Sequence, residues 1–234
     1  MPIRAILLDK DGTLIDFGPM WSDWAETLAR SLDEAIGRPI ETQLFVMLGY
    51  DPVARTVLPG GGLAATPMAR LRERTAAVLA DAGVDRATAE RALRIAWHAP
   101  DPIALARPLT DLRALFERLR AGGLRLAVAT SDDREPSVRT IEALGLTEAV
   151  EAMVCADDGI PVKPAPDMVV HLCEIVGVLP GRTAVVGDAP ADLRMARAAG
   201  AGLVVGVLTG VGERADLEPL ADVVLDSVEA LARD

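Results

Sequence analysis

Short apolar runs alternate with longer amphipathic segments along most of this chain. The run at residues 3–8 ends in acidic residues, which is typical of a buried parallel strand followed by a turn. Further apolar runs predict strands at 124–129, 152–155, 183–186, 202–207 and 222–225. Helical spacing of apolar residues predicts helices near 112–119, 138–144, 168–176 and 193–199, with a last short helix ending at Leu231. This alternation predicts an α/β fold with a mostly parallel, doubly wound sheet.

One long region interrupts the alternation. From about residue 21 to residue 98 the pattern becomes helical and rich in Ala, Leu and Arg, with Gly- or Pro-containing breaks at 37–39, 58–62 and 82–85. A Pro-bearing stretch at 99–108 leads back to the strands. We therefore predict a Rossmann-like core formed by residues 1–15 and 102–234, and an all-helical domain inserted at 16–101.

Composition and charge restrict the partners of the protein. The 234 residues are 50% hydrophobic but only 3% aromatic, so we expect a core built mostly of Ala, Leu and Val. The formal net charge of −11 disfavours binding to nucleic acid or to an anionic membrane surface, because such binding relies on clustered Lys and Arg. No apolar run reaches the roughly 18 residues that a membrane-spanning helix needs. We expect a cytoplasmic protein without a signal peptide, and no feature indicates an oligomeric state.

The two cysteines and two histidines do not form a recognisable site. Cys155 and Cys173 lack a ligand spacing with His98 and His171 that would suit zinc. We predict that both cysteines are reduced thiols in the core.

The first apolar run delivers two carboxylates. Asp9 and Asp11 follow it, and Gly12 allows the backbone to turn sharply there. An Asp side chain can act as a nucleophile toward phosphorus, and a second carboxyl two residues later can move a proton. Because an ordinary Asp has a pKa of about 3.9, Asp11 could serve as an acid near neutral pH only if burial or neighbouring carboxylates raised its pKa.

Three later strands also end in residues suited to phosphate or metal chemistry. Thr130 and Ser131 follow the second strand and can hold a phosphate oxygen. Lys163 lies in a Pro-flanked turn before a helix and can place a point charge against a phosphate. Asp188 and Asp192 follow the strand at 183–186, and their hard oxygen atoms suit Mg²⁺. In a doubly wound sheet these strand ends share one edge, where the ligand binds.

The order of these motifs resembles the haloacid dehalogenase superfamily of phosphohydrolases. Asp-x-Asp-Gly-Thr at residue 9 is followed by a strand ending in Thr, by Lys-Pro-x-Pro-Asp at residue 163, and by Gly-Asp-x-x-x-Asp at residue 187. The helical insertion looks like the cap of phosphoglycolate-phosphatase-like and β-phosphoglucomutase-like members. The four motifs together are specific, whereas each alone is weak.

The resemblance implies a role for each motif residue. Asp9 would be the nucleophile that becomes aspartyl phosphate, and Asp11 the general acid and base. Thr130 and Lys163 would bind the phosphoryl group, with Ser131 standing where Asn is common. Mg²⁺ would be held by the Asp9 carboxylate, the Asp11 backbone carbonyl, Asp188 and, directly or through water, Asp192. Lys10 is a second departure, because an apolar or aromatic residue is more usual between the two acids.

The predicted activity is therefore Mg²⁺-dependent hydrolysis of a small phosphomonoester, with phosphoglycolate as a first guess. The alternative is a β-phosphoglucomutase-like phosphosugar mutase, which uses the same motifs. A receiver-like signalling domain fits less well, because its phosphorylated Asp lies on a later strand and it has no cap. Asp11 argues against a dehalogenase, which lacks that second acid, and the absence of apolar spans argues against a cation-pumping ATPase.

Substrate specificity is less readable from the sequence. Four residues of the first motif and the insertion are candidates for contacting the substrate, namely Phe17, Tyr50, Arg55 and Gly61. Trp21, Trp24 and Trp97 are interpreted mainly as packing residues. Cap arginines at positions 70, 72, 74, 91 and 94 are interpreted as a solvated helix face.

Overall fold

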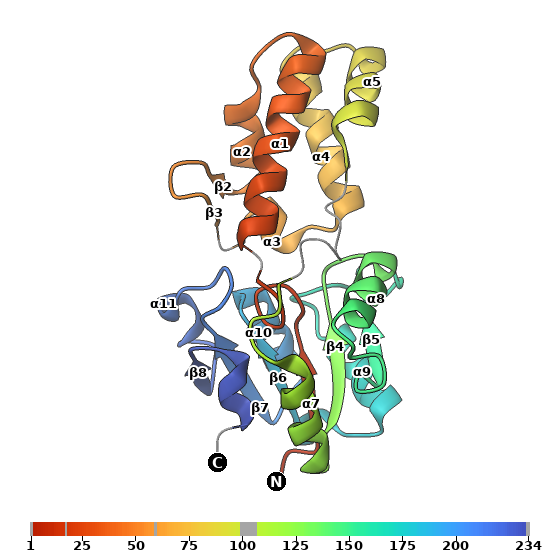
Figure 1. Ribbon diagram of the computed structural model, residues 1–234, viewed down its shortest axis with the longest axis vertical. Coiled ribbons are helices and arrows are strands. Elements are labelled where there is room, and N and C mark those ends of the chain that lie inside the picture. Colours follow the sequence, from red (N-terminus) through yellow and green to blue (C-terminus); the bar gives the residue numbers. More distant parts are fainter. Residues whose placement is uncertain (1, 17, 59, 99–106, 233–234) are drawn as a thin grey trace. The chain divides into compact units, whose positions relative to one another are not determined.

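The computed structural model describes residues 2–16, 18–58, 60–98 and 107–232 (Figure 1). The chain divides into two compact units. Unit 1 contains Met1–Phe17 and Pro102–Asp234, and unit 2 contains Gly18–Asp101. The predicted domain boundary at residue 101 lies outside the described residues, and the other predicted boundary, between residues 15 and 16, is two residues from the start of unit 2.

Unit 1 is built on a six-stranded sheet in which every pair of neighbouring strands is parallel. The strand order is β5-β4-β1-β6-β7-β8, so the first strand lies near the middle of the sheet. In chain order these strands are β1 (Ala5–Leu8), β4 (Arg125–Ala129), β5 (Ala152–Val154), β6 (Thr183–Gly187), β7 (Leu203–Val207) and β8 (Val223–Leu225). All six predicted strands are confirmed, and so is the parallel α/β fold.

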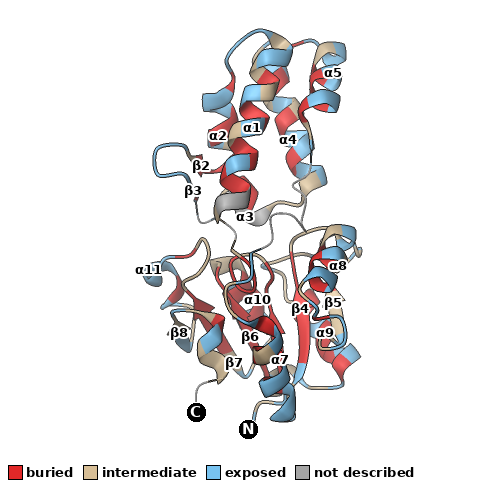
Figure 2. Ribbon diagram, in the orientation of Figure 1, coloured by how far each residue is buried: buried red, intermediate tan, exposed pale blue. Residues whose placement is uncertain are grey.

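Helices cover both faces of this sheet because successive strand residues point to opposite sides. Ile6 and Leu8 of β1 join one core cluster, and Ala5 and Leu7 join the other. The first cluster includes residues of α7 (Leu112–Ala121) and α8 (Arg134–Ala143), while the second includes α9 (Asp167–Val176), α10 (Pro190–Ala198) and α11 (Arg214–Leu217). Two short 3₁₀ helices, η1 (Pro180–Arg182) and η2 (Val228–Ala232), complete the unit. Figure 2 shows the strands of the sheet as mostly buried.

The chain leaves unit 1 and re-enters it along two adjacent segments. The Asp16 amide donates to the Arg107 carbonyl at 2.8 Å, and the Leu109 amide donates to the Leu14 carbonyl at 3.0 Å. Ile15 and Pro108 form an antiparallel bridge between these two hydrogen bonds. We call these paired residues, 14–16 with 107–109, the stem of the insertion.

Unit 2 is a helical assembly that packs its own core. Its helices are α1 (Gly18–Ile36), α2 (Glu41–Leu48), α3 (Gly62–Ala65), α4 (Met68–Asp81) and α5 (Arg86–Ala96). The predicted breaks near 37–39 and 82–85 fall where α1 and α4 end. Trp24 makes edge-to-face contacts with Trp21 and Trp97, with ring centroids 5.6 and 5.3 Å apart, which confirms the predicted packing role of these aromatics.

Unit 2 differs from the prediction of an all-helical insertion in one element. β2 (Tyr50–Asp51) and β3 (Thr56–Val57) form a short antiparallel hairpin. The Asp51 carboxylate accepts hydrogen bonds from the amides of Val53 and Ala54 at 2.8 and 3.0 Å, which stabilises the turn locally. Two residues per strand are too few to produce a readable alternation, so the hairpin left no signal in the hydrophobic pattern.

Candidate active site

The carboxyl ends of the central strands place the predicted site residues on one edge of the unit 1 sheet. Asp9 directly follows β1, Thr130 follows β4, and Asp188 follows β6. Leu8 of β1 pairs with both Val128 and Val186, so the three strand ends are in register around Asp9. The Asp9 amide donates to the Val186 carbonyl at 2.9 Å, which extends this register into the loop. The sheet itself therefore fixes the backbone at the site.

Lys163 connects two of the predicted carboxylates. Its ammonium group forms a close ion pair with Asp9 and lies 2.6 Å from Oδ1 of Asp192. The Lys163 side chain is only 5% exposed, and those of Asp9 and Asp192 are 10% and 3% exposed. Because these side chains are buried, added salt weakens their ion pairs less than it weakens ion pairs on the surface. The structure thus brings together residues that are more than 150 positions apart in the sequence.

Three buried carboxylates form a group that could hold a metal ion. Ligand oxygens of Asp9, Asp188 and Asp192 all lie within 4.8 Å of one another. Such an all-oxygen set suits a hard divalent cation such as Mg²⁺. Asp192 is oriented by the start of α10, because its other oxygen, Oδ2, accepts a hydrogen bond from the Ala189 amide at 3.0 Å.

Burial and like charge make Asp9 and Asp188 hard to ionise without a cation. Burial raises the pKa of Asp9 to about 7 against the lowering effect of Lys163, and Asp192 and Asp11 raise it further. The pKa of Asp188 is also raised, first by burial and then by Asp9 and Asp192. Burial lowers the pKa of Lys163, but Asp192 and Asp9 outweigh that effect and keep the ammonium group charged. The site therefore favours a bound positive charge.

Asp11 lies beside a second buried cation. The Lys10 ammonium group is 2.5 Å from Oδ2 of Asp11 and 2.9 Å from Oδ2 of Asp132. Oδ1 of Asp11 is buried and has no hydrogen-bond partner among the described residues. Burial raises the pKa of Asp11 to about 6, although Lys10 lowers it, and Asp132 adds to the increase. Among its charged neighbours, Lys10 has the largest effect on the pKa of Asp11, and Asp132 is the neighbouring carboxylate that raises it.

The loop after β7 contributes contacts that the motifs did not indicate. The Val211 amide donates to Oδ2 of Asp188 at 2.8 Å, and the Gly212 amide donates to the Asp188 carbonyl at 3.0 Å. The Thr209 hydroxyl donates to the Gly12 carbonyl at 2.6 Å. A Cβ atom at Gly210 would lie 1.9 Å from Oδ2 of Asp188, so only glycine fits there. The Gly-Val-Gly sequence at 210–212 was the one sequence feature that could have indicated that this loop contacts the site.

Thr13 belongs to the first motif but was not predicted to be a site residue. Its hydroxyl lies 3.3 Å from Oδ1 of Asp188 and the residue is fully buried. Thr130 is 1% exposed, and its hydroxyl oxygen accepts a hydrogen bond from the Asp132 amide at 3.1 Å. Ser131 is half-buried in the same loop. The loops after β1 and β4 thus support Asp188 and Asp132, respectively.

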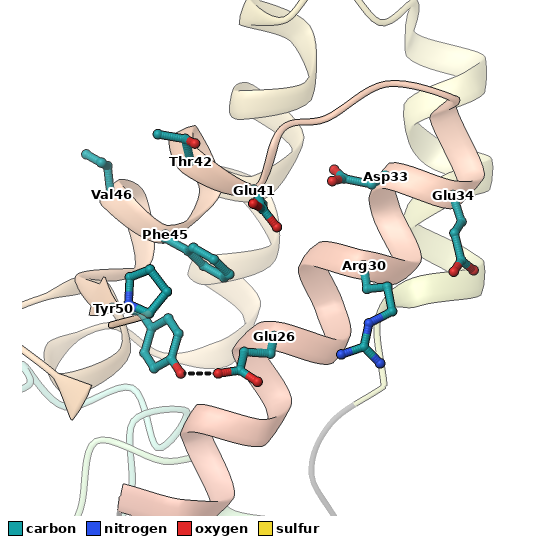
Figure 3. Close-up of a pocket in the computed structure, with 10 residues that line it drawn as sticks. Glu26, Arg30, Asp33, Glu34, Glu41, Thr42, Phe45, Val46 and Tyr50 are labelled. Carbon is teal, nitrogen blue, oxygen red and sulfur yellow. Dashed lines mark hydrogen bonds between the residues drawn. The ribbon is translucent and has the colours of Figure 1, made fainter. Parts of the chain in front are cut away.

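Two of the specificity candidates, Tyr50 and Arg55, contact helix α1 of unit 2, and Figure 3 shows the contact of Tyr50. The Tyr50 hydroxyl is 2.6 Å from Oε1 of Glu26, beside a cavity of about 550 Å³ that residues of this unit line. Arg55 is 2.8 Å from Asp23 and 3.4 Å from Glu26. Both side chains therefore have partners within unit 2.

The other two specificity candidates are Gly61 and Phe17. Gly61 packs against the backbone of Gly49, where an added Cβ would lie 2.8 Å from the Gly49 Cα. This contact gives Gly61 a packing role within unit 2. Phe17 lies outside the described residues.

The cysteines are not part of the site. Cys155 and Cys173 are both free and buried, which confirms their predicted place in the core. Burial raises the pKa of the Cys155 thiol to about 11, so it is a poor nucleophile. In the part of the chain that the structure describes, no helix has the length and apolar character needed to cross a membrane.

Comparison with known proteins identifies the family. The family model of haloacid dehalogenase-like hydrolases matches residues 3–200. The phosphoglycolate phosphatase of Rhodospirillum rubrum is 32% identical over 203 residues, covering 86% of this chain and 78% of that protein. The plasmid-encoded phosphoglycolate phosphatase of Cupriavidus necator is 31% identical, covering 99% of this chain and 92% of its own length. The chain therefore belongs to the haloacid dehalogenase-like hydrolases.

Solved structures agree on the fold. A predicted phosphoglycolate phosphatase from Haemophilus somnus aligns with a TM-score of 0.69 at 19% identity, covering 98% of this chain and 96% of the other. A candidate β-phosphoglucomutase from Thermotoga maritima aligns with a TM-score of 0.66 at 20% identity, covering 98% and 97%. The predicted family and fold are confirmed, and the curated relatives support the predicted phosphatase class.

Proposed function

We propose that this hydrolase is a Mg²⁺-dependent phosphatase that cleaves a small phosphomonoester through an aspartyl-phosphate intermediate. The observation that carries the proposal is the position of Lys163 between Asp9 and Asp192, inside the buried carboxylate cluster. Hydrolysis of phosphate monoesters develops negative charge on the phosphoryl oxygens, and a buried cation next to a nucleophilic carboxylate offsets that charge. Phosphoglycolate is the first substrate to test, because the curated relatives are named for it.

Two steps use the paired acids of the first motif. In the first step a carboxylate oxygen of Asp9 bonds to phosphorus, the bond from phosphorus to the alkyl oxygen breaks, and Asp11 gives its proton to that oxygen. In the second step water attacks the phosphorus of the aspartyl phosphate, Asp11 takes a proton from the water, and the bond to Asp9 breaks. Inorganic phosphate leaves and both acids return to their starting states.

The remaining site residues bind charge. Thr130, Ser131 and Lys163 would hold the phosphoryl oxygens during both steps. Asp9, Asp188 and Asp192 would hold Mg²⁺ together with the Asp11 carbonyl, since their oxygens fit a hard cation. When bound, the ion neutralises charge on the phosphoryl group and lowers the cost of ionising the buried carboxylates.

Unit 2 is proposed to act as a cap that selects the substrate. Its size and its continuous insertion between β1 and β4 support this role. Tyr50, Arg55 and Gly61 stay candidates for specificity, with Phe17 of the connecting segment. A small phosphorylated metabolite as the substrate, without nucleic acid or membrane partners, and a cytoplasmic location stay predictions.

The experiment is phosphate release, with Mg²⁺ or with a chelator, from phosphoglycolate, hexose phosphates, nucleotides and p-nitrophenyl phosphate. Asp9→Asn is expected to lower kcat by on the order of 10³-fold or more, because the nucleophile is lost. Asp216→Asn, an exposed acid on α11, is the matched control and should leave kcat unchanged. Full activity of Asp9→Asn would refute the mechanism, and interconversion of sugar phosphates without phosphate release would identify a mutase.

A further inference from the structure

The chain has only two lysines, and each contacts a different acid of the first motif. Lys163 pairs with Asp9, and Lys10 pairs with Asp11. Lys10 is 2% exposed, although it follows the proposed nucleophile directly in the sequence. A lysine is rarely buried unless its charge is paired, so its position depends on the carboxylates around it.

Asp132 is the second partner of Lys10 and is itself fixed in place. Its amide donates to the Thr130 hydroxyl oxygen at 3.1 Å, and its carbonyl accepts from the Ala156 amide at 2.9 Å. The Lys10 backbone is also fixed, because its carbonyl accepts from the amides of Leu14 and Ile15. The Lys10 side chain is therefore held at both ends, by its own loop after β1 and by the loop after β4.

The two carboxylate oxygens of Asp11 therefore have different surroundings. Oδ2 is 2.5 Å from the Lys10 ammonium group, whereas Oδ1 is buried without a hydrogen-bond partner among the described residues. A carboxyl group held by one oxygen has lost most of its rotational freedom, and only the other oxygen can exchange a proton. Reactions that depend on a positioned acid lose rate when that acid can rotate.

We propose that Lys10, supported by Asp132, is the positioning residue of Asp11. Lys10 fixes Oδ2 and leaves Oδ1 as the oxygen that gives its proton to the leaving alkyl oxygen as the bond to phosphorus breaks. The same oxygen takes the proton from water in the second step. This inference rests on the proposed phosphatase function and assigns a purpose to the residue that departs from the usual pattern between the two acids.

The test compares leaving groups. A glycolate leaving group needs a proton from Asp11, whereas p-nitrophenolate leaves readily without one. Lys10→Met is expected to lower kcat/KM for phosphoglycolate by on the order of 10- to 100-fold, because general acid catalysis contributes about 10²–10⁴-fold, and to lower kcat/KM for p-nitrophenyl phosphate by less than about threefold. We compare kcat/KM because it reports the steps up to release of the leaving group, whereas kcat also includes hydrolysis of the aspartyl phosphate, which uses Asp11 and is the same for both substrates. If another alkyl phosphate of the substrate panel is hydrolysed faster than phosphoglycolate, it replaces phosphoglycolate.

Two further variants make the result decisive. Asp132→Asn keeps the contact between Lys10 and Asp11 and should show a smaller loss with the same dependence on the leaving group, even if Lys10→Met fails to fold. Arg197→Met breaks an ion pair with Asp222 in the same unit and is the matched control, expected to keep wild-type kcat on both substrates. Unchanged kcat/KM, or equal losses of kcat/KM on both substrates, in folded Lys10 and Asp132 variants would overturn the inference. A wild-type protein that is inactive on every substrate would instead overturn the proposed function on which the inference rests.

Discussion

Each buried acidic residue of the site lowers the stability of the folded protein, but together these residues can bind a cation. Asp9 and Asp188 are buried in one cluster, Asp11 is mostly buried beside Lys10, and the pKa of each of the three is raised, mainly by burial. Keeping such groups together lowers the free energy of unfolding, and this kind of cost is typical of functional sites. Lys163 and Lys10 offset part of the negative charge, and a divalent cation would offset more.

This crowding predicts an unusual dependence of stability on pH in the presence of a chelator. Because the pKa values of Asp9 and Asp11 are raised to about 7 and about 6, the folded state holds more protons than the unfolded state between about pH 4 and pH 7. The free energy of unfolding therefore decreases as pH rises through that window. Urea denaturation should give a value roughly 1–3 kcal/mol higher at pH 5.5 than at pH 8.

Two variants check the origin of that effect. Asp188→Asn removes a buried carboxyl group whose pKa is raised and should reduce the difference between the two pH values, whereas the exposed Asp216→Asn should not change it. Saturating Mg²⁺ should raise stability most at pH 8, which lies above the pKa of about 7 of the ligand Asp9. Stability that stays constant or increases from pH 5.5 to pH 8 in chelator would show that the carboxylates ionise normally.

Single residues were predictable where the sequence gives them a local context. Asp9, Asp11, Thr130 and Asp188 each follow an apolar strand, and parallel strands bring their carboxyl ends to one edge. The pair of Lys10 and Asp132 was not predictable in this way. The two residues are 122 positions apart, and no local sequence pattern indicates which of several acidic residues will form an ion pair with a buried lysine.

At the scale of elements, the loop after β7 supports the site from a strand that carries none of the predicted motif residues. It holds Asp188 through the Val211 amide and holds the first motif through Thr209, which contacts the Gly12 carbonyl. β7 pairs with β6 in parallel, with Gly206 beside Gly187, so this loop starts level with Asp188. Sheet register thus determines which loop can reach the site.

Gly210→Ala is expected to displace Asp188, because the added Cβ would lie 1.9 Å from its Oδ2 atom. We expect kcat to fall by at least about tenfold and the Mg²⁺ concentration for half-maximal activity to rise, since a shift of about 1 Å at a site is costly. Gly181→Ala is the matched control in the same unit, because no atom lies within 4 Å of its added Cβ. Kinetics titrated with Mg²⁺ would measure both effects, and wild-type values for Gly210→Ala would contradict this role of the loop.

Elements with strong periodicity were predicted and weak ones were not. The prediction placed the helices now seen as α7, α9 and α10 within a few residues, because each has an apolar stripe at helical spacing. The four-residue helices α3 and α11 and the hairpin of β2 and β3 are shorter than the period that would reveal them. Their formation depends on tertiary contacts, such as the close approach of Gly49 and Gly61.

At the scale of the whole molecule, the stem should allow unit 1 to fold without unit 2. Asp16 and Arg107 are hydrogen-bonded at 2.8 Å, so a short Gly/Ser linker can replace residues 18–101 without stretching the backbone. Because both core clusters of the sheet lie within unit 1, we expect the shortened protein to unfold cooperatively. Circular dichroism during thermal unfolding would measure this, and a non-cooperative transition would show that unit 1 needs the insertion in order to fold.

The central position of β1 also has a consequence for synthesis on the ribosome. Ala5 pairs with Arg125 and with Thr183, so β1 leaves the exit tunnel long before either neighbouring strand has been made. During that interval the helices of unit 2, whose contacts are local, can form, while an apolar strand remains without a partner. The nascent chain therefore leaves its first strand without its sheet partners throughout translation of the insertion, which favours transient non-native contacts of that strand until β4 has been made.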